Sequence, residues 1–347
     1  MLSSHPLERI QLNNESNWRT VLKKAFKDPL ELLEFLGLDR AEYLDKVKTD
    51  SRFKMLVPLS YAEKMQKGDW NDPLLQQVLP INQENIETRG FVNDPIGDLQ
   101  AEASSGLLHK YQGRVLLVTT GAFPVHCRYC FRREFPYADS SPDKKQWQNT
   151  LDYIQGDNSI HEVIFSGGDP LMLSDDRLQK MCVEITAIPH VKTLRFHTRV
   201  PVFLPERINQ SLRKMFTALS AVQDIQKVMV VHINHANEID EHVSRALSDL
   251  RKDGFSLLNQ SVLLKEVNDD VATLSELSHK LMANHVLPYY LHQLDRIQGA
   301  AHFEVERDRS IKLMEGLRNN LPGYLVPRLV EDISGKRSKL PIEKNPE

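Results

Sequence analysis

The stretch Thr119–Tyr137 reads Thr-Thr-Gly-Ala-Phe-Pro-Val-His-Cys-Arg-Tyr-Cys-Phe-Arg-Arg-Glu-Phe-Pro-Tyr. An apolar run, Val115–Val118, leads into it, and it carries two of the chain's three cysteines, Cys127 and Cys130. Two thiolates three positions apart in a loop can hold a metal ion or a cluster, and the arginines around them stabilise anions. Taken alone, a C-x-x-C pair fits a zinc half-site, a redox dithiol or two unliganded thiols.

Composition limits the kind of protein this chain can be. Its 347 residues suffice for one large domain or two small ones, and 44 basic against 47 acidic residues give a net charge of −3. This balance argues against a nucleic-acid binder that works by bulk electrostatics. Three cysteines make no disulfide framework, and the sequence shows neither a long apolar segment nor a signal-peptide pattern. We therefore expect a soluble, cytoplasmic protein.

From Arg114 onward, short apolar runs alternate with amphipathic segments. We expect strands at Val115–Thr120, Glu162–Ser166, Thr193–Thr198, Val228–Ile233, Leu257–Leu264 and Pro288–Gln293. We expect helices between them at Lys145–Gln155, Asp175–Ile185, Pro205–Leu219, Glu238–Asp253 and Val271–Asn284. Six strands separated by helices predict parallel βαβ units, and hence an α/β fold in the form of a partial (β/α) barrel.

Polar residues follow directly after several of these apolar runs. They occur in Ser166-Gly167-Gly168-Asp169, in Phe196-His197-Thr198-Arg199, in His232-Ile233-Asn234-His235 and in His292-Gln293-Leu294-Asp295. In barrels of this type the active site lies at the carboxyl ends of the strands. The sequence therefore predicts a site there, beside the cysteine loop.

The segments on either side of this pattern differ from it. Residues 1–110 look helical and irregular, with helices expected at Trp18–Phe26, Pro29–Leu36 and Tyr61–Lys67. Near the other end we expect a helix at Ile311–Leu317 and an edge strand at Tyr324–Leu329, followed by a basic, polar tail. We thus expect an N-terminal helical extension (1–110), a core (111–300) and a C-terminal segment (301–347).

The cysteine stretch resembles the radical S-adenosylmethionine loop, C-x-x-x-C-x-x-C, of the lysine 2,3-aminomutase family. The likeness is carried by Cys-Arg-Tyr-Cys-Phe-Arg-Arg followed by Phe-Pro-Tyr, and it extends over essentially the whole chain. It implies a six-stranded radical S-adenosylmethionine barrel, a [4Fe–4S] cluster on three thiolates, S-adenosyl-L-methionine and pyridoxal 5′-phosphate. One position differs: the first cysteine should lie four residues before Cys127, where this chain has Phe123.

The resemblance implies roles for the cysteine loop and the strand that follows it. Cys127 and Cys130 would be two of the three cluster ligands. The adjacent His126 could supply a third, but it is disfavoured because its side chain should leave the loop in a different direction from position 123. The Gly-Gly-Glu/Asp motif of the family contacts the methionine part of the cofactor. It matches the segment made of Ser166, Gly167, Gly168 and Asp169. Cys182 lies in a helical pattern and is expected in the core.

The resemblance also implies residues for the second cofactor and the substrate. Lys339, in Ser338-Lys339-Leu340-Pro341, matches the catalytic lysine that carries pyridoxal phosphate, with Lys336 as the alternative. Arg132 would bind the substrate's carboxylate, and Asp295 and Asp332 its distal ammonium. Further matches without an assigned role are Asn234, His235, Asn237 and Glu238.

The implied activity is that of an isomerase converting L-α-lysine to β-lysine by radical 1,2-amino migration. Within the family, the resemblance is greatest to members that supply β-lysine for modification of elongation factor P by its lysyl ligase. Two alternatives stay open: a catabolic lysine 2,3-aminomutase, and a disabled variant or scaffold, which Phe123 would explain. No nucleic acid or membrane partner is expected, and the oligomeric state, a homo-oligomer included, stays open.

Overall fold

The computed structural model describes residues 17–51, 53–137, 144–222 and 224–344. At its centre is one mixed sheet whose strands lie in sequence order, with β1 and β10 as the two edges, so the sheet is not closed. The strands are β1 (Glu102–Ser104), β2 (Leu107–Tyr111), β3 (Arg114–Val118), β4 (Glu162–Ser166), β5 (Thr193–Thr198), β6 (Gln226–Val231), β7 (Ser256–Val262), β8 (Leu287–His292), β9 (Arg328–Glu331) and β10 (Leu340–Pro341).

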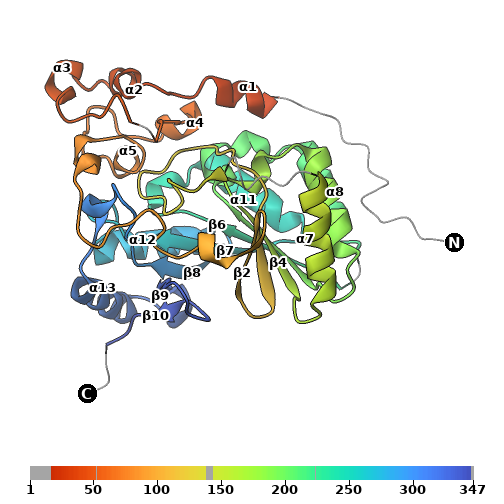
Figure 1. Ribbon diagram of the computed structural model, residues 1–347. Coiled ribbons are helices and arrows are strands. Elements are labelled where there is room, and N and C mark those ends of the chain that lie inside the picture. Colours follow the sequence, from red (N-terminus) through yellow and green to blue (C-terminus); the bar gives the residue numbers. More distant parts are fainter. Residues whose placement is uncertain (1–16, 52, 138–143, 223, 345–347) are drawn as a thin grey trace.

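Helices connect the parallel strands and cover the outer face of the sheet (Figure 1). The α-helices are α1 (Asn17–Lys23), α2 (Pro29–Phe35), α3 (Arg40–Tyr43), α4 (Leu59–Ala62), α5 (Pro73–Gln76), α7 (Lys144–Gly156), α8 (Asp175–Thr186), α9 (Val200–Phe203), α10 (Gln210–Leu219), α11 (Glu241–Lys252), α12 (Val271–Ala283) and α13 (Arg307–Asn320). Short 3-10 helices are η2 (Asn82–Asn85), η3 (Leu99–Ala101), η4 (Pro170–Met172), η5 (Pro205–Arg207), η6 (Ala236–Glu238), η7 (Ala301–Phe303) and η8 (Gly323–Leu325).

The six predicted strands are confirmed as β3 to β8, with each end within two residues of the expected position. Neighbouring strands from β3 to β9 pair in parallel. The register sets Val118 opposite Ser166, and Val262 opposite His292, which brings the carboxyl ends of these strands to one edge. Polar residues that follow the strands therefore meet at that edge, as expected for an α/β fold.

Side-chain caps fix where the connecting helices begin. The hydroxyl of Ser174 and the side-chain oxygens of Asn209, Asp240 and Asp270 accept hydrogen bonds from backbone N–H groups in the first turns of α8, α10, α11 and α12. For this reason the expected helix Pro205–Leu219 is broken, and its long part starts only after Asn209. Gly254, with φ +88°, follows α11, as the predicted helix stop requires.

Two expectations about strands were wrong. A hairpin, β1–β2, lies in the region expected to be helical, and it pairs antiparallel with β3 through the turn at Gly113, whose φ is +77°. The expected edge strand Tyr324–Leu329 begins later, as β9, and is not an edge, because β10 pairs with it antiparallel. Both additions extend the sheet beyond the six strands that the apolar pattern predicted.

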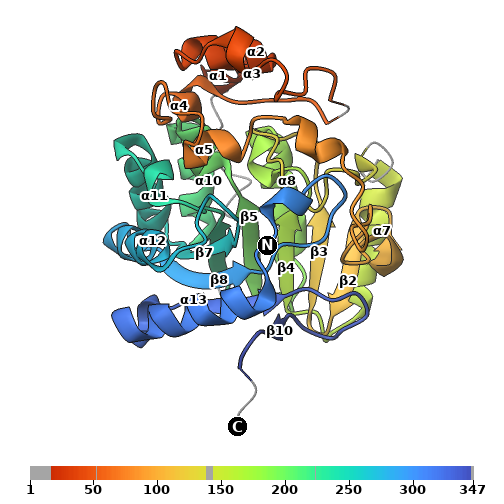
Figure 2. The ribbon, with the colours of Figure 1, turned by 90° about the vertical axis from the view of Figure 1, so that its left-hand side faces the viewer.

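The N-terminal helices lie over one end of the sheet, as Figures 1 and 2 show. They belong to the same hydrophobic core as the strands, which joins Leu33 and Tyr61 to Phe165 and Phe203. The rings of Tyr61 and Phe203 stack with their centroids 3.9 Å apart. Through this packing, the N-terminal helices cover part of the sheet end at which the predicted site residues gather.

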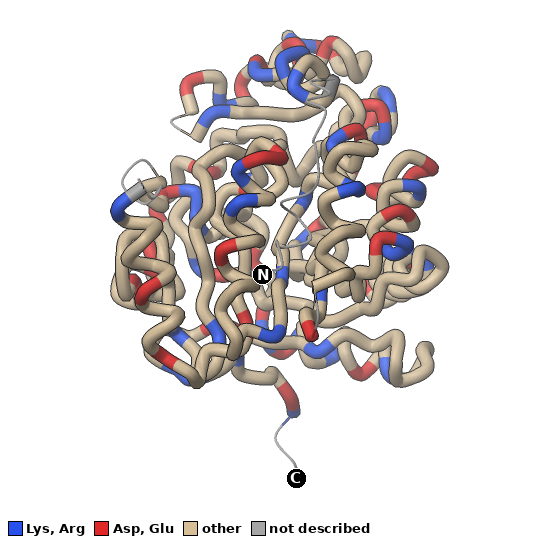
Figure 3. The backbone as a smooth tube through the Cα atoms, turned by 90° about the vertical axis from the view of Figure 1, so that its right-hand side faces the viewer, with Lys and Arg blue, Asp and Glu red and all other residues tan. Residues whose placement is uncertain are grey.

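Positions of basic and acidic residues are interspersed along the backbone, as Figure 3 shows. In the described parts of the chain, no helix is both long enough and apolar enough to cross a membrane.

Candidate active site

A cavity of about 370 Å³ opens at the carboxyl ends of the parallel strands. Its walls come from the cysteine loop, the strand ends, the β2 hairpin and the C-terminal tail. All the residues that we assigned to a site from the sequence line this cavity: Cys127, Cys130, Arg132, Ser166, Gly167, Gly168, Asp169, Asp295, Asp332 and Lys339. The two disfavoured alternatives, His126 and Lys336, are not among its lining residues.

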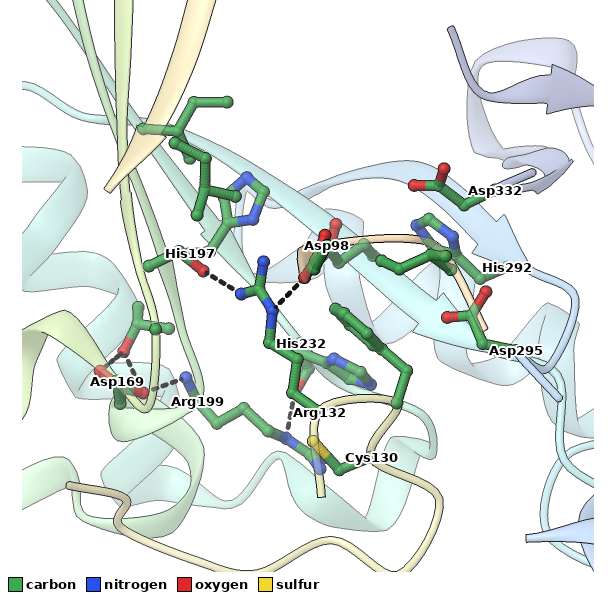
Figure 4. Close-up of a pocket in the computed structure, with 18 of the residues that line it drawn as sticks. Asp98, Cys130, Arg132, Asp169, His197, Arg199, His232, His292, Asp295 and Asp332 are labelled. Atoms are coloured by element: carbon green, nitrogen blue, oxygen red, sulfur yellow. Dashed lines mark hydrogen bonds and ion pairs between the residues drawn. The ribbon is translucent and has the colours of Figure 1, made fainter. Parts of the chain in front are cut away.

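Figure 4 shows how charge is distributed in this cavity. Asp295, His292 and Asp332 lie on one side, and Asp169 and Arg199 lie on the other. The cavity therefore has one end rich in carboxylates and one end beside the cysteine loop.

Hydrogen bonds from Arg199 hold the cysteine loop in place. Arg199 donates a hydrogen bond to Sγ of Cys127 and another to the hydroxyl of Tyr129. Burial raises the pKa of the Cys127 thiol, against the opposing effect of Arg199, and raises that of Cys130 to about 11. Both side chains thus sit in surroundings that disfavour an uncompensated thiolate.

The position of the expected third ligand is filled by an aromatic ring. Phe123 packs edge to face against Tyr137, with centroids 5.1 Å apart, and against His126 at 5.6 Å. His126 turns away, because its Nδ1 lies 2.6 Å from the carbonyl oxygen of Lys54. Within the described residues, no three His, Cys, Asp or Glu side chains are placed to hold a metal. The donors present therefore do not fit a cluster that needs three protein thiolates.

The Gly-Gly pair is needed for a close approach between two segments of this chain. A Cβ at Gly167 would lie 2.8 Å from the carbonyl oxygen of Thr120, and one at Gly168 would overlap the backbone of Ala122. The N–H of Gly168 donates to Thr120 O at 2.7 Å, and that of Asp169 donates to Ala122 O at 2.9 Å. The glycines thus dock strand β4 onto the cysteine loop, a reason that the sequence alone did not show.

The Asp169 carboxylate is occupied by the chain's own donors. It accepts hydrogen bonds from Thr198 Oγ1 and from the backbone N–H groups of Leu171, Arg199 and Val200. Burial raises its pKa to about 6, although these hydrogen bonds act in the opposite direction. Asp169 therefore fixes the turn between β5 and α9 in addition to lining the cavity.

Between the two ends, the predicted carboxylate-binding Arg132 is already paired. Its Nε donates to Asp98 at 2.7 Å and its Nη1 to the hydroxyl of Ser166 at 3.2 Å. Asp98 also pairs with Lys110 at 2.6 Å. These contacts fix the plane of the guanidinium, and among the described residues no hydrogen bond is seen from Nη2, which lies available for a substrate oxygen.

Strand pairing places Lys339 beside Asp332. β10 pairs with β9 so that Leu340 faces Glu331, and the same antiparallel register puts Lys339 opposite Asp332. The Lys339 Nζ lies 2.8 Å from Asp332 Oδ2. The hydroxyl of Tyr111 donates to both oxygens of Asp332, at 3.0 and 3.1 Å.

Asp295 differs from its neighbours because no hydrogen bond to its carboxylate is seen among the described residues. Burial raises its pKa to about 7; Lys339 opposes this rise, and Asp332 and Asp98 add to it. A cation placed beside Asp295 would favour its ionised form. Its position is therefore suited to the ammonium of a bound molecule.

Three residues of this end, Asp98, Lys110 and Tyr111, were missed from sequence. Asp98 and Lys110 lie in the expected helical extension, 1–110, and Tyr111 is the first residue after it; β2 brings Lys110 and Tyr111 into the cavity. A signal was present, because Leu107–Tyr111 and Arg114–Val118 are strand-like runs separated by only two residues, the second of which is Gly113.

The four unassigned family matches divide into two pairs. Asn234 and Glu238 are buried beneath the cavity: Asn234 Nδ2 donates to the hydroxyl of Tyr129 at 2.6 Å, and Glu238 Oε2 lies 3.4 Å from Arg199 Nη2. His235 and Asn237 instead form the start of η6 and do not line the cavity. The buried pair thus supports the residues that hold Cys127. Cys182 is fully buried in α8, as expected.

The cavity offers the groups that pyridoxal phosphate would need. Besides the Lys339 amine it is lined by two arginines, Arg114 and Arg195, and by Tyr289 and Tyr290. An amine suits a carbonyl carbon, guanidinium groups suit a phosphate, and phenol rings suit an aromatic ring. The residues present therefore fit this cofactor.

An α/β sheet with a polar cavity at the carboxyl ends of its parallel strands, lined by an amine and several carboxylates, defines an enzyme. No family model matches the chain. It is 44% identical over 337 residues to L-lysine 2,3-aminomutase of Escherichia coli strain K12, covering 96% of this chain and 97% of that protein. The protein of that name from Haemophilus influenzae is 43% identical, covering 94% and 96%, and that from Clostridium subterminale is 34% identical, covering 95% and 78%. The chain belongs to the L-lysine 2,3-aminomutase family.

Proposed function

We propose that this chain binds L-lysine and pyridoxal phosphate and is built to convert L-α-lysine to β-lysine. The observation that carries the proposal is the joint presence in one cavity of Lys339, Arg132, Asp295 and Asp332. A guanidinium at one point and two carboxylates at another would select an amino acid with a distal ammonium, because an uncharged side chain would leave the carboxylates unpaired. The open sheet would serve as a partial (β/α)6 barrel, flanked by the N-terminal and C-terminal segments as predicted.

In this proposal Lys339 holds the cofactor and Arg114 neutralises its phosphate; the charge of Arg195 is already paired with Glu162, so Arg195 would add only a hydrogen bond. When bound, the cofactor's conjugated ring delocalises electrons from the carbon atoms between which nitrogen migrates. The chain's own residues bind and orient: Arg132, fixed by Asp98 and Ser166, receives the substrate carboxylate. Asp295 and Asp332 receive the distal ammonium.

The radical half of the reaction calls for S-adenosyl-L-methionine and a [4Fe–4S] cluster, which the family name implies. We assign Ser166, Gly167, Gly168 and Asp169 to the first, and Cys127 and Cys130 to the second. Because Phe123 supplies no third thiolate, we derive no step through the cluster. A folded member of the family that binds lysine and pyridoxal phosphate without radical chemistry is therefore the second candidate function.

The biological setting is part of the same proposal. The chain covers 97% of the length of its Escherichia coli relative and 78% of the Clostridium subterminale protein. The segment Ser338-Lys339-Leu340-Pro341 resembles the corresponding segment of members that supply β-lysine for elongation factor P and its lysyl ligase, and it favours that cytoplasmic role over a catabolic one.

Borohydride reduction followed by peptide mapping tests the cofactor assignment. Protein incubated with pyridoxal phosphate should carry the reduced pyridoxyl group on Lys339. Lys336, three residues earlier and exposed, is the internal control because it has the same amine outside the cavity. Labelling of Lys336 in place of Lys339 would reject the assignment.

A further inference from the structure

Two ammonium groups would compete for the negative charge of the Asp332 carboxylate. In this structure its carboxylate pairs with the Lys339 ammonium at 2.8 Å, and the side chains of Lys339 and Asp332 are 25% and 10% exposed. The proposed function assigns the same carboxylate to the distal ammonium of lysine. Two ammonium groups on one carboxylate would repel each other, so the Lys339 contact and the substrate contact compete.

Most carboxylates at this end of the cavity already have a cationic partner. The carboxylates are Asp98, Asp295 and Asp332, and the cations in contact with them are Lys110, Arg132 and Lys339. Lys110 and Arg132 are both held by Asp98. Arg114 adds a further positive charge, since its guanidinium lies 4.8 Å from the centre of the Tyr111 ring. A substrate ammonium would therefore find no unpaired carboxylate among the described residues of this end except Asp295.

We propose that Asp332 is a counterion used in turn: it neutralises Lys339 while the cofactor site is empty, and it is released to the substrate's ammonium when the cofactor attaches. This inference rests on the proposed function. The ammonium first loses a proton to solvent, and Nζ then forms a C=N bond to the cofactor's carbonyl carbon while the carbonyl oxygen leaves as water. The two hydrogens that remained on Nζ leave in that water, so Nζ ends without a hydrogen and without a charge.

Attachment would thus leave the negative charge of Asp332 without its cationic partner. That charge matches the single ammonium at the end of a lysine side chain. The consequence is an order of binding, in which the carbonyl cofactor enters before the diamino substrate. Lysine would bind poorly to the empty protein, because Lys339 holds one of its two carboxylate partners.

Tyr111 keeps the released carboxylate in position. Its hydroxyl contacts both oxygens of Asp332, and this contact does not depend on Lys339. Desolvation, together with the nearby Asp332 charge, raises the pKa of Tyr111, so the phenol stays protonated and remains a donor. Asp332 would therefore await the substrate in a fixed orientation after Lys339 has left.

The test measures binding of L-lysine by calorimetry to full-length protein without cofactor. Lys339→Met removes the competing ammonium, and lysine should then bind roughly tenfold more tightly than to the unaltered chain, a change of about 1.4 kcal/mol. L-Norleucine, which lacks only the distal ammonium, should bind equally to both. Lys336→Met removes the same charge from the same segment outside the cavity and should leave lysine binding unchanged.

The double variant Lys339→Met/Asp332→Asn should lose the gain, since the released carboxylate is gone. The proposal is wrong if Lys339→Met binds lysine no more tightly, if norleucine gains equally, or if Lys336→Met gives the same gain. Borohydride mapping is a separate readout: pyridoxal phosphate on Lys339 without the lysine gain would retain the proposed function and reject this competition. The lysine gain with labelling elsewhere would retain the competition between Lys339 and lysine for Asp332, but would reject both the cofactor assignment and the release of Asp332 by the cofactor.

Discussion

Arg128, between the two cysteines of the loop, is fully buried and pairs with Glu84, 44 residues earlier in the chain, through its Nε at 2.7 Å and through Nη2. Arg133, after the loop, reaches the same carboxylate with its Nη2 at 2.7 Å. Burial alone would raise the pKa of Glu84, but Arg128 and Arg133 hold it below its usual value. The N-terminal segment thus fixes the cysteine loop by charge as well as by apolar packing.

Glu84→Gln should therefore destabilise the protein by about 3–5 kcal/mol, because it leaves the buried Arg128 with no carboxylate and Arg133 with only the exposed Glu134, 3.9 Å away. The effect should depend on pH. A carboxyl whose pKa is lowered by folding contributes stability above its unfolded pKa, and this contribution is lost as pH falls through the folded value. Urea unfolding at neutral pH and at decreasing acid pH should show the difference between variant and parent shrinking.

The matched control is Glu34→Gln. Glu34 forms an ion pair with Arg40 at 3.2 Å, but the side chains are 70% and 51% exposed, so its loss should cost less than about 0.5 kcal/mol. Equal losses for the two variants would show that Glu84 does not anchor the loop.

The parallel strands could be predicted because their signal is local. Runs such as Glu162–Ser166 are short, apolar and followed by glycine or polar residues, and burial on both faces requires that composition. β1 and β10 are only three and two residues long, so no periodic pattern can mark them. Their place depends on pairing with β2 and β9, which is a tertiary property.

The site residues, too, divide into those with a local signal in the sequence and those placed only by the tertiary structure. Residues that follow strands, such as Asp295, were found because parallel strands end at one edge. Lys110 and Tyr111 were missed since a hairpin, and not a strand end, carries them into the cavity. The role of the Gly167–Gly168 pair in docking two segments depends on backbone distances, which sequence does not contain. The functional roles of the predicted residues remain predictions.

Asp295→Asn should weaken lysine binding by about 2–5 kcal/mol and leave pyridoxal phosphate binding nearly unchanged. The reason is that Asp295 lies at the carboxylate end with no hydrogen-bond donor seen among the described residues, whereas Lys339 carries the cofactor. Calorimetry with cofactor-loaded protein would measure the first effect and cofactor absorbance the second. Unchanged lysine affinity would show that Asp295 does not contact the substrate.

The same variant should change the dependence of stability on pH. The pKa of Asp295 is raised to about 7, above its unfolded value, so its contribution to stability is present in acid and is lost as pH rises through 7. Without ligand, Asp295→Asn should therefore raise the melting temperature relative to the parent more at pH 8 than at pH 5. An offset independent of pH would contradict the assignment of that raised pKa.

Gly168→Ala should disturb the contact between β4 and the cysteine loop. The added methyl would overlap the backbone of Ala122, which cannot move without shifting the loop, and overpacking of this kind costs about 1–3 kcal/mol. Gly156→Ala is the control, because a Cβ there meets nothing within 4 Å. Thermal unfolding should show a loss for the first variant and none for the second; two equal values would contradict the docking role.

Phe123 is the position that decides whether the chain can hold a [4Fe–4S] cluster. We predict that the chain as it stands assembles little or no cluster and that Phe123→Cys allows assembly. Two thiolates remain, at Cys127 and Cys130, and His126 is turned away toward the Lys54 carbonyl oxygen. The third iron would need a poorer ligand, because thiolates are the preferred ligands of these clusters.

Phe123→Ser separates the effect of the ligand from that of the ring. It removes the ring that packs against Tyr137 and supplies no thiolate. All three proteins should fold, since the core is built from strands and helices without a metal. After anaerobic reconstitution with iron and sulfide, only the cysteine variant should approach four irons per chain and show the cluster's visible absorption. If the unaltered chain binds four irons equally well, a residue outside the cysteine pair completes the site and the ligand argument is wrong.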